Sequence, residues 1–253
     1  MNHVLQTTAV LCVRELTHFI RQRNRLIGAF LQPLLFWVLI GTGMNPTFQS
    51  PVDGFSYMDF FFTGIVLMIL LFTSIFATMS IIDDRNSGFL QGVLASPAPR
   101  IGIVLGKAAG GTTMGTAQAL LLLPLVWTPF LSLELSAGGA LWLLVMLVWT
   151  SFFLTVLGVV IAWGVDSSQG YHAIMSVVLF PLWIFSGAAF PTEGVPGWLH
   201  ALMQINPLTH ALALIRSGFA GFAAPSPVSI SYLAILTVVL LLMACRMVSR
   251  KEA

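Results

Sequence analysis

The sequence predicts an all-α membrane protein with six transmembrane helices and both termini in the cytoplasm. Of its 253 residues, 57% are hydrophobic and only 8% are charged, and the mean hydropathy is +0.93. An ordinary soluble domain carries about 25% charged residues, because a core of this size must be covered in water. Six apolar runs reach the length of about 20 residues that crosses a bilayer as a helix. Basic residues cluster at the ends of these runs and set their orientation.

The first 25 residues have the pattern of an amphipathic helix. Two sets of side chains recur at the i, i+4, i+7 spacing of a helix face. The apolar set is Leu5, Ala9, Cys12 or Val13, Leu16 and Ile20, and the polar set is Arg14, His18, Arg21 and Arg25. Basic side chains suit anionic headgroups, so we predict that residues 1–25 form an interfacial helix on the cytoplasmic leaflet. A solvated helix with an ordinary polar face is the alternative.

Six apolar runs follow, and each is predicted to form one transmembrane helix. They cover residues 26–44, 60–82, 101–127, 139–163, 171–190 and 228–247. Their interiors hold Ser and Thr but almost no ionisable groups. Lys107, near the start of the third run, is expected to extend its amine to the inner interface. A proton- or sodium-coupled transporter usually needs ionisable groups in mid-membrane, so the sequence argues against one.

Glycines recur at helical spacing in the third run. They are Gly102, Gly106 and Gly110 on one face, and Gly111 and Gly115 on an adjacent face. The stretch "GIVLGKAAG" is only superficially similar to a phosphate-binding P-loop, since it has GxxxGK in place of GxxxxGK and Ala108 in place of Ser or Thr. Small residues at this spacing let two helices approach closely, so we interpret the run as a packing stripe.

The distribution of basic residues predicts the orientation of the chain. With six spans, all but one of the 11 Lys and Arg residues fall on the same side of the membrane. They are Arg14, Arg21, Arg23, Arg25, Arg85, Arg100, Lys107, Arg246, Arg250 and Lys251. Because cytoplasmic loops are enriched in basic residues, that side is predicted to be the cytoplasm. Arg216 is the one basic residue assigned to the outer side.

The loop between the second and third runs, residues 83–97, has the densest charge of any loop between spans. Asp83, Asp84 and Arg85 open it and Pro97 ends it. Its apolar residues at helical spacing are Phe89, Leu90, Val93 and Leu94. This pattern predicts a short helix whose apolar side chains fill a groove on a partner, with the two acids at its N-terminal end, where the helix dipole favours them. An interfacial loop without a partner is the alternative.

Residues 191–222, between the fifth and sixth runs, are too interrupted to span a membrane and too apolar for a solvated loop. Asn206 followed by Pro207 is a good helix start. Two short re-entrant helices in the outer leaflet, with Trp198 at the interface, would satisfy the backbone. Arg216 falls near the end of the second helix, where a cation suits the helix dipole, so we expect it to be structural. Contact with an anionic substrate or lipid is the alternative.

The sequence predicts no catalytic, cofactor, metal or nucleic-acid site. Cys12 and Cys245 lie at opposite ends of the chain without ligands at metal-binding spacing, and His200 and His210 are flanked by apolar residues. The net charge is only +2 and no basic patch is present, so nucleic acid is not expected as a partner. If such a chain moves a solute uphill, the energy must come from another protein.

Two motifs carry a resemblance to a known family. The loop "DDRNSGFLQGVLASP" is similar to the family pattern "ERExGTLExLLxSP", with Gly88 and the Leu-Leu-Ser-Pro end in place. Asn86, Ser87 and Phe89 depart from that pattern. The segment "FPTEGVPGWLHALMQINPLTHALALIRSGF" is similar to the family's Pro…Trp-Leu…Asn-Pro…Arg…Gly-Phe pattern before the last span. The chain thus resembles, over its whole length, the membrane subunit of ABC-2-type transporters, which include bacterial drug, Nod-factor and polysaccharide exporters.

The resemblance implies a function and a set of partners. Residues 83–97 would form a coupling helix against a separate ABC ATPase subunit, which holds the ATP and Mg²⁺. A homodimer, or a pair with a similar permease, would bind two ATPase copies in the bacterial cytoplasmic membrane, with spans 1, 2 and 5 lining an export pathway. An apolar pathway dotted with Ser and Thr suits an amphipathic or lipid-linked substrate. A stand-alone secondary transporter or channel, and a non-transporting assembly protein, are the alternatives.

Overall fold

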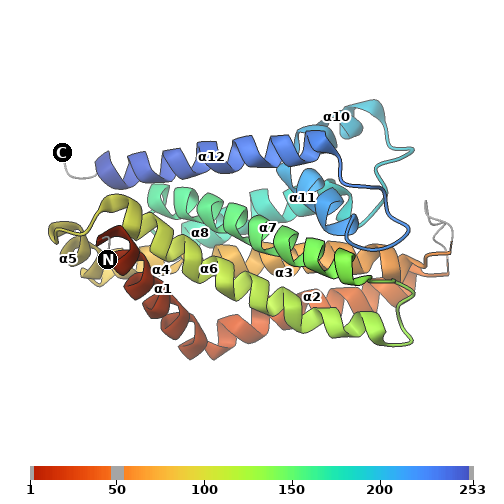
Figure 1. Cartoon of the computed structure of the whole chain (residues 1–253), viewed down its shortest axis with the longest axis horizontal. Coiled ribbons are helices and arrows are strands. Elements are labelled where there is room, and N and C mark those ends of the chain that lie inside the picture. The colour runs from red at the N-terminus through yellow and green to blue at the C-terminus, as the bar shows by residue number, and fades with distance from the viewer. Residues whose placement is uncertain (1–2, 47–53, 251–253) are drawn as a thin grey trace.

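The computed structural model describes residues 3–46 and 54–250, without the side chains of residues 23, 25, 26 and 250. Every regular element in these residues is a helix. The long helices run side by side in one bundle (Figure 1). The start of α1 (His3–Arg21), the end of α12 (Pro227–Arg250) and the short helix α5 (Phe89–Ala95) all lie at one end of it. We call this end the termini end.

Six helical stretches among the described residues are long and apolar enough to cross a membrane, which confirms the predicted number. They are Ile27–Met44, Tyr57–Asn86, Arg100–Trp127, Ala137–Gly164, Ser168–Ala188 and Pro227–Ser249. The helices that form the first four are α2 (Arg23–Met44), α3 (Tyr57–Thr78) with α4 (Ser80–Asn86), α6 (Arg100–Leu122) with η1 (Leu123–Trp127), and α7 (Ala137–Gly164). The fifth is interrupted, and α12 forms the sixth.

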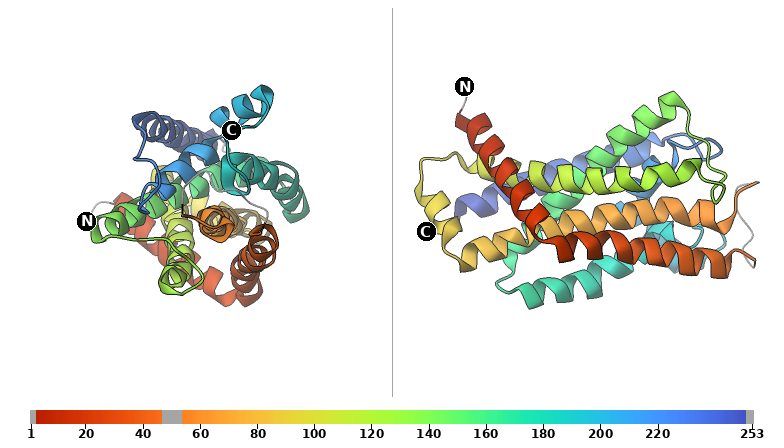
Figure 2. Two further views of the ribbon diagram at one scale, coloured as in Figure 1. Left: turned by 90° about the vertical axis from the view of Figure 1, so that its right-hand side faces the viewer. Right: turned by 90° about the horizontal axis from the view of Figure 1, so that it is seen from below.

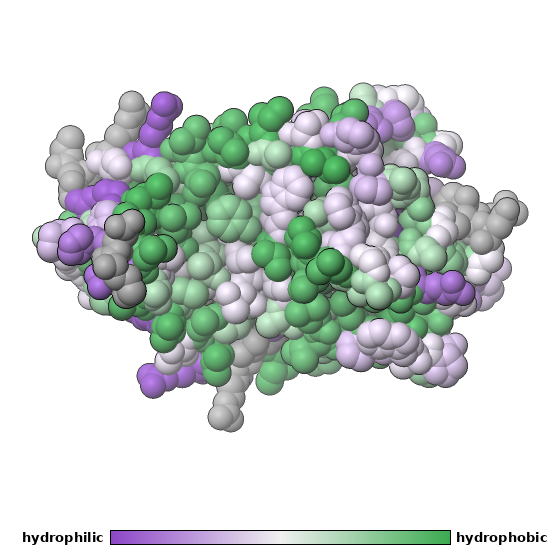
Figure 3. Space-filling view, viewed as in Figure 1, coloured by the Kyte–Doolittle hydropathy of each residue, from purple (hydrophilic) through white to green (hydrophobic). Residues whose placement is uncertain are grey.

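The α3 helix is at the centre of the bundle, as the end-on view in Figure 2 shows. In an 18-residue window of its membrane-spanning stretch 83% of residues are buried, against 22% in the window of α2 and 28% in that of α12. The outer helices therefore present apolar side chains outward, and Figure 3 shows hydrophobic residues around the middle of one face with hydrophilic ones toward both ends. A surface of this kind suits lipid as the surrounding solvent.

The fifth stretch consists of four short pieces. They are α8 (Ser168–Ile174), the π-helical turn η2 (Met175–Leu179), α9 (Phe180–Trp183) and the π-helical turn η3 (Ile184–Ala188). Pro181 lacks a backbone N–H and so interrupts the regular ladder of hydrogen bonds just after η2. Trp183 Nε1 donates to the carbonyl oxygen of Gly64 at 2.9 Å, which fixes this broken span against α3.

Two short helices, α10 (Gly197–Ile205) and α11 (Pro207–Arg216), lie at the end of the bundle opposite the termini end (Figure 1). Asn206 caps α11, because its Oδ1 accepts a hydrogen bond from the Leu208 backbone N–H at 2.9 Å. Its Nδ2 donates to the Leu182 carbonyl oxygen at 2.6 Å. The Asn-Pro helix start read from the sequence is therefore present, and it also joins α11 to the fifth span. Trp198 on α10 is exposed.

The N-terminal helix α1 packs along α6 on the glycine stripe. A Cβ atom added to Gly106 would lie 2.7 Å from Leu11 Cβ, and one added to Gly110 would lie 2.6 Å from Glu15 Cβ. These distances are too short for real side chains, so only glycine permits the approach. The predicted face with Gly106 and Gly110 therefore has α1 as its partner, whereas Gly111 and Gly115 on the adjacent face approach Thr155 and Ser151 of α7.

The opposite face of α1 carries exposed apolar side chains. Leu5, Val13 and Ile20 are 61%, 63% and 57% exposed. They belong to the apolar set predicted from the sequence, and their exposure suits contact with lipid. That α1 lies in a leaflet surface stays a prediction.

Candidate functional site

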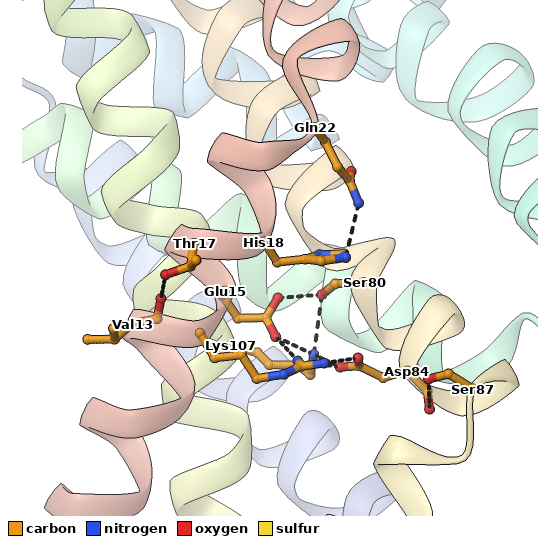
Figure 4. A network of polar contacts seen from close by, with 10 residues as sticks. Val13, Glu15, Thr17, His18, Gln22, Ser80, Asp84, Ser87 and Lys107 are labelled. Carbon is orange, nitrogen blue, oxygen red and sulfur yellow. Dashed lines mark hydrogen bonds and ion pairs between the residues drawn. The ribbon is translucent and has the colours of Figure 1, made fainter.

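A buried cluster of charges joins three helices near the termini end (Figure 4). Lys107 of α6 lies between two carboxylates, with its Nζ 2.7 Å from Glu15 Oε1 and 2.7 Å from Asp84 Oδ2. The three side chains are at most 6% exposed. A buried charge is tolerated only where its partners neutralise it. The cluster therefore holds α1, α4 and α6 in one relative position.

Ser80 and Arg14 complete this cluster. Ser80 Oγ donates to Glu15 Oε2 at 2.5 Å and accepts from Lys107 Nζ at 3.2 Å. Arg14 binds Asp84 through both of its Nη atoms, with Nη1 2.9 Å from Oδ2, and Nη1 is also 3.0 Å from Glu15 Oε1. Burial opposes the charge of Arg14, but its hydrogen bond and ion pair with Asp84 outweigh this and raise its pKa above the ordinary value. Arg14 therefore stays a cation.

The sequence assigned Arg14 to a lipid-facing surface, and the structure corrects this. The guanidinium turns toward Asp84 and lies 3.7 Å from the centre of the Phe89 ring. A buried carboxylate is neutralised only by its protein partners, whereas a lipid headgroup is also solvated by water. This explains why the Arg14 side chain points inward to Asp84. The polar face was predicted to contain three further residues. His18 contacts Gln22, and Arg21 is exposed. The side chain of Arg25 lies outside the described residues.

The two acidic residues that open the loop at 83–97 lie in a different helix from the one predicted. α4 continues α3, so Asp83 and Asp84 stand in the last turns of a long helix rather than the first turn of a short one. The helix dipole is unfavourable to carboxylates there, contrary to the prediction. Lys107 and Arg14 supply the positive charge that compensates for Asp84.

Gly88 makes the turn between α4 and α5. Its φ of 80° lies in the left-handed region, where residues with a side chain pay about 1–2 kcal/mol. The predicted short helix therefore begins at Phe89, with Val93 half-buried on it. Arg100 Nη1 donates to the Leu94 carbonyl oxygen at 2.7 Å and closes the far end of α5. Pro97 is exposed just beyond it.

Only part of the predicted apolar face of α5 is open to a partner. Leu90 was expected to fill a groove on another protein, but it is 4% exposed because α5 folds back against α4. Leu90 and Leu94 instead line a groove of about 180 Å³ together with Arg85 and Trp163. Phe89, which is 39% exposed, is the large apolar side chain that α5 presents outward.

Arg85 attaches α4 to the end of α7. Its Nη1 donates to the Val165 carbonyl oxygen at 3.0 Å, and its Nη2 donates to those of Trp163 at 3.2 Å and Ala162 at 3.3 Å. The last carbonyls of a helix lack partners within it, so a cation at this position satisfies them and complements the dipole. Nη1 is also 3.0 Å from Oδ1 of the exposed Asp166. Arg85, which was predicted to contact a partner protein, thus caps the C-terminal end of α7.

Arg216, the last residue of α11, lies at the opposite end of the bundle. Its Nε donates to Thr63 Oγ1 at 2.9 Å, and its Nη2 donates to the carbonyl oxygens of Gly187 at 3.0 Å and Phe60 at 3.4 Å. The guanidinium also lies 4.1 Å from the centre of the Phe60 ring. These contacts join α11 to α3 and η3, in keeping with the structural role expected for Arg216.

The sequence alone identified only half of the charge cluster. It singled out Arg14 and Asp84, it did not single out Glu15, and it expected Lys107 to reach the membrane interface. The signal that could have located Glu15 is its spacing, since it falls four residues from both Leu11 and Phe19 on the buried face of α1. An acid on that face requires a cation on the helix opposite.

The charge cluster provides a mechanical link between helices. Within residues 3–46 and 54–250, no three His, Cys, Asp or Glu side chains gather so that they could hold a metal ion. The charged groups of the cluster neutralise one another and tie α4 to α1 and α6, while Arg85 ties α4 to α7. A displacement of α4 would therefore act on three helices at once.

Comparisons with known proteins give a consistent result. A family model described as "ABC-2 type transporter" matches residues 6–220. The transport permease ycf38 of Cyanophora paradoxa is 26% identical over 220 residues, which cover 84% of this chain and 73% of that protein. Nodulation protein J of Rhizobium meliloti (strain 1021) is 25% identical over 197 residues, covering 76% and 72%. The daunorubicin resistance ABC transporter permease protein DrrB1 of Streptomyces coeruleorubidus is 26% identical over 207 residues, covering 78% and 70%.

Proposed function

The chain belongs to the ABC-2 type transporter membrane family, and we propose that it is the permease subunit of an ATP-driven exporter. In this role its helices form the transmembrane pathway for an amphipathic or lipid-linked substrate. A separate ABC ATPase subunit binds ATP and Mg²⁺ and supplies the energy. The chain itself provides the transport pathway and its conformational change, and the ATPase subunit carries out ATP hydrolysis.

The observation that carries this proposal is the attachment of α4 to the rest of the bundle. The exposed Phe89 opens α5, and Gly88 connects α5 directly to α4. Asp84 then links α4 to α1 and α6, and Arg85 links it to α7. A push from an ATPase on α5 would therefore reach three helices through short, charged contacts. A freely moving loop could not transmit a force in this way.

The charge distribution supports placing the termini end in the cytoplasm, where ATP is found. Arg14, Arg85 and Lys107 lie toward that end, on α1, α4 and the first turns of α6, whereas Arg216 lies at the other. Basic residues favour the cytoplasmic side of a membrane. We therefore assign the protein to the bacterial inner membrane with α10 and α11 in its outer leaflet as re-entrant helices.

The exposed apolar faces support a second permease copy as a partner. Leu39 on α2 is 67% exposed, and Val177 and Val178 of the broken fifth span are 74% and 51% exposed. Two copies that meet along these faces would form the pathway between them, and each copy would bind one ATPase subunit. The proposed assembly is thus a homodimer with two ATPase chains.

Co-purification of an ATPase subunit with the tagged chain from its native membrane tests this function. The variant Phe89→Asp places a charge on the exposed face of α5 and is expected to abolish retention of the ATPase while membrane insertion stays intact. Phe130→Asp is the matched control, because Phe130 is 66% exposed in the loop between η1 and α7, away from the termini end. Full retention of the ATPase by Phe89→Asp would contradict the proposed coupling surface.

A further inference from the structure

A cavity lined by a cation and several hydroxyl groups lies beside α11, at the end of the bundle opposite the termini end. Its volume is about 230 Å³, and its polar lining is Ser186, Thr192, Thr209, Arg216 and Ser226. A water molecule takes up roughly 30 Å³ of liquid, so the cavity has room for a group of several heavy atoms. A smaller hollow of about 170 Å³ adjoins it and shares Thr192 and Arg216.

Arg216 has donors to spare for a ligand in this cavity. Its Nε and Nη2 are occupied by Thr63, Gly187 and Phe60, but Nη1 takes part in no hydrogen bond within the described part of the chain. No carboxylate among the described residues forms an ion pair with it. Arginine stays charged in proteins, and a partly buried cation without a carboxylate favours an anion that brings acceptor oxygens.

Thr209 provides an independent sign of a missing acceptor. Its Oγ1 is buried and has no hydrogen-bond partner among the described residues, although Thr209 lines the same cavity as Arg216. Buried hydroxyl groups are nearly always paired, and Thr116 and Thr150 also carry unpaired ones, but Thr209 is the one of these three threonines that lines a described cavity. The Thr209 oxygen has almost no accessible surface in the structure, so a rotation about χ1 would have to turn the hydroxyl into the cavity before it could donate to an anion held by the guanidinium.

We propose that this cavity binds a phosphate group, held by Nη1 of Arg216 and by the hydroxyl of Thr209. Planar guanidinium donors match phosphate oxygens well. Among the described residues that line the cavity and the adjoining hollow, the acidic side chain that opposes binding is that of Glu193, which is exposed. In transport, the site would select a substrate or lipid with an anionic headgroup at this end of the bundle. That role rests on the proposed function. Binding itself does not rest on that function.

Thermal unfolding of the purified chain in dodecyl maltoside tests the site. Dihexanoyl phosphatidic acid is the probe, and dihexanoyl glycerol, which lacks the phosphate, is the matched control ligand. A ligand that binds only the folded chain raises its unfolding temperature. We expect a rise with phosphatidic acid alone, and a dissociation constant at least about tenfold larger in Arg216→Gln, since a charge-assisted hydrogen bond is lost.

Three further variants separate binding from folding. Thr209→Val is expected to weaken binding several-fold without lowering the stability of the free chain, because it removes an unpaired buried hydroxyl. Glu193→Gln is expected to tighten binding, and Arg246→Gln, on the exposed surface near the end of α12, is expected to bind as the wild type does. If Arg216→Gln fails to fold, the binding constants of the other two variants still test the proposal, since Thr209→Val should bind more weakly and Glu193→Gln more tightly than the wild type.

The outcomes distinguish the source of the phosphate as well. Stabilisation by inorganic phosphate as strong as that by phosphatidic acid supports a site for free oxyanions, and stabilisation by the lipid alone supports a headgroup site. Equal binding of phosphatidic acid by wild type, Arg216→Gln and Thr209→Val would overturn the proposal. Because no ATPase is present in this assay, its result is independent of the co-purification test.

Discussion

Lys107 and Glu15 are 92 positions apart in the chain, yet Nζ of the first lies 2.7 Å from Oε1 of the second in the protein interior. The pair connects α6 to α1, and Asp84 extends the connection to α4. Removing one partner from such a pair leaves a buried charge uncompensated, which costs far more than the pair itself is worth. The N-terminal helix is therefore an integral part of the bundle and not an attached tail.

Replacement of Lys107 by Met should destabilise the chain by about 3–5 kcal/mol, because it leaves two buried carboxylates with Arg14 as their one remaining cationic partner in the cluster. The measurement is denaturant unfolding in detergent. The double variant Glu15→Gln/Lys107→Met should recover part of the loss, since it removes one of the two carboxylates. Arg246→Gln, on the surface, should change stability by less than about 0.5 kcal/mol. Wild-type stability of Lys107→Met would show that the ion pairs do not form.

Replacement of Gly88 by Ala should cost about 1–2 kcal/mol, because its φ of 80° is strained for any side chain. Gly92→Ala is the internal control. Gly92 lies within α5 and a Cβ there would meet nothing within 4 Å, so this change should be neutral or stabilise the chain by up to about 1 kcal/mol. Unfolding midpoints of the two variants give the comparison, and equal shifts would argue against the turn.

Replacement of Gly106 by Ala should push α1 away from α6, because the new Cβ would lie 2.7 Å from Leu11 Cβ and 3.1 Å from the Thr8 carbonyl oxygen. Overpacking of this kind costs about 1–3 kcal/mol. Faster cleavage of α1 by a protease at low concentration would report the displacement. Gly28→Ala in α2, where nothing lies within 4 Å, should leave the cleavage rate unchanged. Identical rates for both variants would contradict the close packing.

The orientation predicts which residues a membrane-impermeant thiol reagent can reach in intact cells. In a background with Cys12 and Cys245 changed to Ser, Trp198→Cys on the exposed surface of α10 should be labelled. Asp166→Cys, whose native side chain is 91% exposed after α7, should be labelled only after lysis. The reverse pattern would place α5 outside the cell and would rule out its contact with a cytoplasmic ATPase.

Local patterns in the sequence were sufficient for the number of spans and for several helix ends. Apolar length is a property of neighbouring residues, which is why six spans could be counted. The start of α11 was likewise predictable, since Asn206 caps its helix within two residues.

Long-range pairing was the part that local patterns could not predict. Asp83 and Asp84 were assigned to the start of a helix because acids suit that position, but they lie at the end of one. The placement of Asp84 is stable because Lys107 and Arg14 approach it from two other helices, and only the folded bundle brings them there. The same reasoning explains why Leu90 was predicted to face a partner and is buried instead.

The charge cluster also has a consequence for biogenesis. The stretch that contains Lys107 has the lowest hydropathy of the six, 1.2, so it is the segment least able to leave the translocon for lipid unaided. Glu15 and Asp84 precede it in the chain and are therefore synthesised first. When the third span is synthesised, its two acidic partners are already present, so the order of synthesis allows Lys107 to be neutralised as this span enters the membrane.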